Sequence, residues 1–172
     1  MIVFTRPKAE SLFKNIECKQ MLISYKLPDG TWSEPEVLPS PLNLDCEDAP
    51  VLVHDNQTLF FSSVRERMDD KGKILEAKDV GFDLFFTKML AKGVWATPSL
   101  LEDFSTEFHD KYLSVPVTGN PGYYRVSELK GKSLSSEVWQ KEQKIKPNPV
   151  ATITGKVTDL RSEKPIQATV SI

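Results

Sequence analysis

Short apolar runs recur along this chain, and turn residues separate each run from the next. The run at 21–26 is followed by a glycine turn and a segment that opens with Trp32. The run at 84–88 is followed by a similar turn and a segment that opens with Trp95. Each set predicts a β-hairpin, because a glycine turn between two apolar runs favours antiparallel pairing.

The two hairpins belong to a longer repeat of short strands. The second copy is complete, with strands predicted at 49–54, 58–63, 82–89 and 95–101. The first copy begins at its second strand, and the third copy has three predicted strands, at 111–115, 123–127 and 137–140. Four-stranded repeats rich in aromatics are typical of β-propeller blades. Residues 1–140 are therefore predicted to form a partial β-propeller of about two and a half four-stranded blades.

The pattern favours an all-β fold over a helical one. No long stretch keeps the i, i+3, i+4, i+7 apolar pattern without a proline or a glycine. The 12 prolines and 8 glycines of the chain fall at turn spacing. The highly charged segment 65–73 predicts a surface loop.

The pattern changes near residue 141. Residues 141–149 are polar, basic and proline-bearing, which predicts a short linker. Alternating runs then flank a turn at 159–165, so 150–172 is predicted to be a β-hairpin. Because one hairpin is marginal alone, we interpret it as the first hairpin of a β-sandwich that continues in the natural protein.

Composition narrows the classes of partner. The 172 residues carry a formal net charge of −2, with no basic excess for nucleic acid or an anionic membrane surface. No apolar run approaches the roughly 20 residues of a membrane span. Met1 is followed by a strand-like run rather than a signal peptide, so an exported protein is expected here in a mature or truncated form.

Several spaced motifs carry a family resemblance. They are a Trp-Ser-Glu-Pro segment at 32–35, Pro-Leu-Asn at 41–43, Glu-Asp-Ala-Pro at 47–50, an Asp-x-x-x-Leu-x-Phe-Ser-Ser motif at 55–63 and Gly-Phe-Asp-Leu-Phe-Phe at 81–86. This set resembles the PD40, or WD40-like β-propeller, repeats of envelope proteins from Bacteroidetes-type bacteria. The resemblance covers about residues 1–140 and implies a propeller.

The tail resembles a second family. Segments 154–159, 164–166 and 168–170 are similar to the opening of a carboxypeptidase regulatory-like domain, a transthyretin-like β-sandwich. In OmpA-family proteins of that group, a propeller and this sandwich precede a peptidoglycan-binding domain. The resemblance implies a protein at the periplasmic face of the outer membrane, with other envelope proteins as partners. Peptidoglycan would be reached through a domain absent from this chain. The third repeat is degenerate, so only architecture and location class are transferred.

Catalytic, metal and cofactor sites are not expected. His54 and His109 each lie next to an aspartate, but no Gly-x-Ser-x-Gly elbow accompanies them, and turn histidines are commoner than catalytic ones. The acidic groups at 45–48 and 69–70 do not fit a calcium loop, and Asp48 is interpreted as a turn acceptor before strand 49–54. Gly-rich phosphate loops are absent, so no cofactor is assigned.

Two cysteines, Cys18 and Cys46, lack the spacing of a zinc or thioredoxin-like pair. We favour unpaired, partly buried thiols, and the sequence leaves both their pairing and the redox compartment open. The aromatic residues could form a sugar-binding surface, but their period-2 placement predicts blade core instead. These residues are Trp32, Phe60, Phe61, Phe82, Phe85, Phe86, Trp95, Tyr123, Tyr124 and Trp139.

The function expected from these features is a non-catalytic scaffold or protein-binding module. Its contact surfaces are predicted in the loops 64–81 and 103–110. The alternative is a module that binds carbohydrate or peptidoglycan fragments through the propeller face. An enzyme is the weakest of the three hypotheses.

Overall fold

The computed structural model of the chain consists of antiparallel β-sheets, and this confirms the predicted all-β class. The structure describes residues 1–8, 18–44, 46–65, 67–68, 74–75, 81–130, 133–148 and 155–166. Within these ranges no α-helix occurs, and one 3-10 turn, η2, spans Glu102–Phe104.

The first sheet comes from the start of the chain. It contains β1 (Ile2–Pro7), β2 (Lys19–Ser24) and β3 (Glu36–Val37), in that order. Met21 and Ile23 of β2 point to one face and are buried there, as the alternation of a strand requires.

The middle sheet is the complete repeat predicted from the sequence. Its strands are β4 (Glu47–Leu52), β5 (Thr58–Ser63), β8 (Asp83–Ala91), β9 (Val94–Trp95) and β10 (Ser99–Leu100). The order is β10-β8-β5-β4, and β9 also pairs with β8. The single strand predicted at 95–101 is divided into β9 and β10. Pro98, which has no N–H to donate to a ladder, lies between them.

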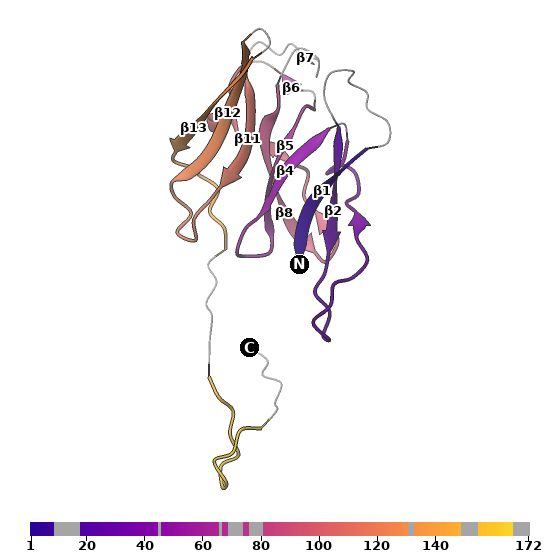
Figure 1. Cartoon of the computed structure of the whole chain (residues 1–172), viewed down its shortest axis with the longest axis vertical. Coiled ribbons are helices and arrows are strands. Elements are labelled where there is room, and N and C mark those ends of the chain that lie inside the picture. The colour runs from indigo at the N-terminus through magenta and orange to yellow at the C-terminus, as the bar shows by residue number, and fades with distance from the viewer. Residues whose placement is uncertain are drawn as a thin grey trace.

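The third sheet contains β11 (His109–Ser114), β12 (Gly122–Lys130) and β13 (Ser133–Lys141), in that order. A separate two-stranded ribbon pairs β6 (Arg67–Met68) with β7 (Ile74–Leu75). Figure 1 shows the three larger sheets side by side, with the middle sheet between the other two.

Two apolar cores hold the three sheets together. The first core lies between the first and middle sheets and includes Ile23, Phe61 and Phe85. The second lies between the middle and third sheets and includes Phe60 and Tyr124. Paired phenylalanines on β5 and β8 therefore serve both faces of the middle sheet, as the sequence predicts for stacked sheets.

The middle and third sheets share one strand pattern. The ladder of β4 and β5 is interrupted after Asp48, and that of β11 and β12 is interrupted after Lys111. In each case the next residue has a positive φ, 48° at Ala49 and 60° at Tyr112. The bulge is thus a repeated feature. The two sheets share one pairing pattern, so each residue near the bulge in one sheet can be matched to an equivalent residue in the other.

Three aromatic residues depart from the predicted core. Trp32, Tyr123 and Trp139 are 46%, 42% and 43% exposed, so their assignment to the core is wrong. Trp32 lies outside the named strands, in an isolated bridge with Lys26. In the described chain, Tyr123 lies on the face of the third sheet that is directed away from the middle sheet, and Trp139 lies on the other face, on the edge strand β13. The other predicted aromatics are buried, or half-buried in the case of Phe86.

The tail beyond the third sheet is described only in part. Residues 155–166 form a turn closed by a bridge between Thr158 and Pro165, and this agrees with the predicted turn at 159–165. Much of the two strands predicted at 150–158 and 166–172 lies outside the described residues, so the β-sandwich stays a prediction. Before this turn, Asn148 donates to Asp55 and to Gln57, at 3.0 and 2.8 Å, which fixes the chain beside the middle sheet.

Candidate functional site

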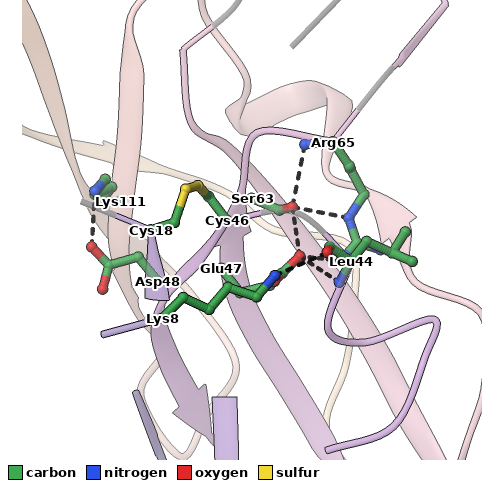
Figure 2. The surroundings of a disulfide bond; sticks show 9 residues. All are labelled: Lys8, Cys18, Leu44, Cys46, Glu47, Asp48, Ser63, Arg65 and Lys111. Atoms are coloured by element: carbon green, nitrogen blue, oxygen red, sulfur yellow. Dashed lines mark hydrogen bonds and ion pairs between the residues drawn. A yellow bond between two sulfur atoms is a disulfide. The ribbon is translucent and has the colours of Figure 1, made fainter. Parts of the chain in front are cut away.

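A disulfide joins Cys18 and Cys46, so the expectation of unpaired thiols is wrong. Cys18 directly precedes β2 and Cys46 directly precedes β4, and their Cα atoms are 4.6 Å apart. Both side chains are buried and pack with Val64 and Phe82. The bond therefore connects the first sheet to the middle sheet, through residues brought together only when the sheets stack (Figure 2).

An ion pair next to the disulfide is also buried. The Arg65 guanidinium lies 3.2 Å from Glu47 Oε1 and donates to the carbonyl oxygens of Pro41 and Leu42 (Figure 2 shows the pair). Burial raises the pKa of the Glu47 carboxyl, while the Leu44 N–H and the Arg65 charge oppose that rise. With Arg65 already engaged in these contacts, the pair is suited to fix a loop against β4 rather than to bind a ligand.

Asp48 links all three large sheets. It lies on β4, and its carboxylate accepts from Lys111 Nζ of β11 at 2.8 Å and from Lys19 Nζ of β2 at 3.2 Å. It also accepts from the Ala49 N–H at 2.8 Å, so the bond predicted in a turn before the strand forms within β4, at its bulge. Burial alone would raise the pKa of Asp48, but the bond and charge of Lys111 and the other donors hold it below its usual value.

The two histidines lie at different strand ends. His54 is in the turn after β4, and Asp55 next to it accepts from Gln57 and Thr58. His109 begins β11, and its Nδ1 accepts from the Phe82 N–H at 3.2 Å. Burial, and secondarily the Lys111 charge, lowers the pKa of His109, which favours the neutral ring that accepts this bond.

The acidic segments are placed only in part. Asp45, Asp69 and Asp70 lie outside the described residues, and Glu47 and Asp48 are engaged as above. Among the residues that are described, no cluster of three or more His, Cys, Asp or Glu side chains is arranged to hold a metal ion.

The exposed surface that could bind a partner lies along β13. All nine of its residues are exposed, and in the described chain it pairs only with β12. Val138 and Leu134, which lie on the same face of this strand, are 75% and 59% exposed.

A hollow of about 200 Å³ lies on the face of β12 and β13 that is directed toward the middle sheet. Phe108, Glu137 and Trp139 contribute to its lining. The Trp139 indole N–H donates to the Glu137 carboxylate at 2.9 Å. The indole also packs edge-on against the buried Tyr124 ring, with 6.3 Å between the ring centres. We call this the inner hollow. It combines a fixed aromatic wall with a carboxylate.

A second hollow, of about 440 Å³, lies on the opposite face of the same strands, and we call it the outer hollow. Tyr112, Tyr123, Arg125 and Val138 line much of it. The Arg125 guanidinium lies 4.6 Å from the centre of the Tyr112 ring, an arrangement that favours a cation–π contact. The strand β13 therefore separates two hollows of apolar and aromatic character.

The predicted contact loops are close to this surface. Much of 64–81 lies outside the described residues, but Gly81 at its end is in close contact with Phe108 of the loop 103–110. Sequence reasoning missed the hollows, because it assigned Tyr123 and Trp139 to the core and gave Val138 no role. The signal that could have found them was the missing fourth strand of the third repeat.

Comparison of the chain with family models, curated proteins and solved structures finds no match to any of them. In the part of the chain that the structure describes, no helix has the length and apolar character required to cross a membrane.

Proposed function

We propose that this chain is part of a non-catalytic, propeller-type scaffold that binds other proteins at the periplasmic face of a bacterial outer membrane. The observation that carries the proposal is the exposed third sheet. This sheet exposes apolar side chains on both faces of its edge, with Tyr123 and Val138 at the outer hollow and Trp139 at the inner hollow. Exposed apolar patches typically mark protein-interaction sites.

Stacked sheets support the propeller element of the proposal. The middle sheet has the strand order expected of a blade, and the third repeats its bulge and register. Each pair of neighbouring sheets buries one apolar core, as blades do. Three such sheets fall short of the four to eight blades that typically close a propeller, and the outer face of the third sheet, where a closed propeller would place its next blade, is the surface that we assign to the partner.

The buried disulfide supports the compartment. Disulfides form and persist in oxidising environments such as the bacterial periplasm and are rare in the cytosol. Cys18 and Cys46 are 2% and 0% exposed, so a reductant has little access to the bond. The family resemblance of the motifs at 32–35 and 55–63 implies the same location.

Affinity retention from an envelope extract tests the binding function. The wild-type chain, Tyr123→Ser, Trp139→Ser and the control Leu160→Ser are immobilised in parallel, Leu160 being 96% exposed in the distant turn. We expect one or more proteins to be retained stoichiometrically by the wild type and the control and lost from the other two variants. Equal retention by all four chains, or by none, contradicts the proposal.

Glycan binding is the second candidate, and the outer hollow favours it. Tyr112, Tyr123 and Arg125 line a cavity of about 440 Å³ and offer stacking surfaces and donors for a sugar. Calorimetry with soluble peptidoglycan fragments distinguishes the candidates. Saturable binding that Tyr123→Ser abolishes, without protein retention from the extract, supports the glycan candidate over the scaffold.

A further inference from the structure

The shared pairing pattern assigns residues 137–141 of β13 equivalents in β8. Before the bulge, Asp48 pairs with Ser62 and Lys111 pairs with Arg125. Ser62 in turn pairs with Leu84 of β8, and Arg125 with Val138 of β13. Counting along the strands from these pairs, Val138 is equivalent to Leu84, Trp139 to Phe85 and Gln140 to Phe86.

In the middle sheet the far edge of β8 is filled by β10. Ser99 pairs with Phe86 and Leu100 with Phe85, and the Leu101 N–H donates to the Leu84 carbonyl at 2.8 Å. The two leucines point to opposite faces, because Leu100 packs against the first core and Leu101 lies in the second. A short segment thus forms hydrogen bonds with the backbone at the edge of β8 and places one apolar side chain on each face of the sheet.

The corresponding edge of β13 is open in the described chain. The described residues that follow β13, 142–148 and 155–166, do not pair with it. The Gln143 N–H donates to Asn120 at 2.8 Å, and Asn148 reaches Asp55 and Gln57 beside the middle sheet. The Leu84 carbonyl points toward the β10 side of β8, away from β5. Val138 is equivalent to Leu84, and Gln140 lies two residues further along the strand. Both therefore direct their backbone N–H and C=O groups to the open edge of β13.

We propose that the open edge of β13 binds an extended segment of a partner protein as an added antiparallel strand. This inference rests on the proposed protein-binding function and specifies its mode. The added strand bonds to the backbone of Val138 and Gln140. One side chain enters the inner hollow beside Trp139, and the next enters the outer hollow beside Val138.

The segment of residues 99–101 that pairs with β8 also indicates the chemistry of the partner. The segment on β8 has the order small polar, large apolar, large apolar, in Ser99, Leu100 and Leu101. The partner segment is therefore an extended peptide with two consecutive large aliphatic residues, one for each hollow. Glu137 at the inner hollow adds a preference for a basic residue next to the pair.

A synthetic peptide with the sequence of residues 95–102 serves as the probe, with fluorescence anisotropy on the full chain as the readout. We expect saturable binding that is lost when both leucines of the peptide are replaced by serine. Val138→Pro removes the N–H at the open edge and leaves the pairing with β12, so we expect it to weaken binding at least about tenfold. Val138→Thr, which keeps the N–H and the branched side chain, should bind as the wild type does. Gln140→Pro is the second edge variant if Val138→Pro is poorly folded by circular dichroism.

Hydrogen exchange gives an independent readout. The amides of Val138 and Gln140 should exchange more slowly when the peptide is added, while the Trp139 amide, directed to β12, is unchanged. Binding that Val138→Pro leaves intact overturns the inference, because the peptide would then occupy another edge. Self-association of the chain that Val138→Pro abolishes overturns it as well, because the occupant would be a second copy. If envelope proteins are retained by Val138→Pro and lost from Trp139→Ser, strand addition is wrong while the proposed function stands.

Discussion

At the scale of single residues, Asp48 connects the three larger sheets. Its carboxylate forms ion pairs with Lys19 of the first sheet and Lys111 of the third. The Nζ of Lys111 also lies 3.5 Å from the centre of the Phe82 ring. Burial lowers the pKa of Lys111, while Asp48 opposes that change. Removing the carboxylate leaves this ammonium without the charge that compensates its burial.

Replacing Asp48 by Asn should lower the free energy of unfolding at pH 7 by about 2 kcal/mol, because the side chain keeps its shape and loses its charge. Urea denaturation measures the change, and Glu142→Gln on the exposed surface is the matched control, with little effect expected. A loss equal to that of the control would contradict the role of Asp48.

The same variant tests pH dependence. The pKa of Asp48 lies below 3.8 in the folded chain, so its contribution is present above the unfolded pKa and is lost as pH falls through the folded one. Between about pH 5 and pH 2, the wild type should therefore lose more stability than Asp48→Asn. Urea midpoints of the two proteins across this range measure the difference, and parallel curves would exclude the shift.

Aromatic residues of the same predicted class should differ in their contribution to stability. Phe60→Ala opens a cavity in the second core and should cost about 3–5 kcal/mol. Trp32→Ala removes a side chain that is 46% exposed and should cost less than about 1 kcal/mol. Guanidinium denaturation of both variants measures the contrast. Similar losses would place Trp32 in a core after all.

At the scale of elements, Gly81 controls how β8 enters the middle sheet beside β11. A Cβ built on Gly81 would lie 2.2 Å from the Phe108 carbonyl oxygen, too close to be tolerated without backbone movement. The next residues are joined across this point, because the Asp110 N–H donates to the Phe82 carbonyl at 2.6 Å. A side chain at 81 should therefore separate two elements that pack together.

Gly81→Ala is expected to destabilise the chain by about 1–3 kcal/mol, since the clash is with backbone rather than a movable side chain. Gly155→Ala is the control, because nothing lies within 4 Å of its added Cβ. Thermal denaturation of the two variants gives the comparison. An unchanged melting temperature for Gly81→Ala would show that the two backbones can separate without cost.

At the scale of the whole molecule, the disulfide connects the first and middle sheets, which also share one apolar core and the ion pair of Lys19 with Asp48. Cys18 and Cys46 are separated by 28 residues, so the bond closes a loop of moderate length in the unfolded chain. Its loss should act on the stacking of the first sheet before it affects the middle and third sheets, which share a separate core.

The double substitution Cys18→Ser/Cys46→Ser should lower the free energy of unfolding by about 3–4 kcal/mol, the loop-closure contribution for this separation. Urea denaturation with and without a reductant measures it. The reductant should shift the wild type toward the variant and leave the variant unchanged. If the folded wild type resists the reductant, the reductant is added to the unfolded chain instead. The reduced protein should then refold to a less stable state than the oxidised one.

The sequence alone determined the local features: the positions of most strands, the turns between them and the repeat. Alternation and turn residues act over a few positions, so β5 was predicted at its observed bounds, and the other strands of the middle sheet were predicted near theirs except that β9 and β10 were expected as one strand. Only the tertiary structure decided which faces and edges are covered. The pairing of Cys18 with Cys46, the partners of Asp48 and the exposure of Tyr123 and Trp139 depend on how separate sheets stack. The open edge of β13 depends on where the following chain goes. These are long-range contacts, and the period of a strand specifies its two faces without specifying what covers them.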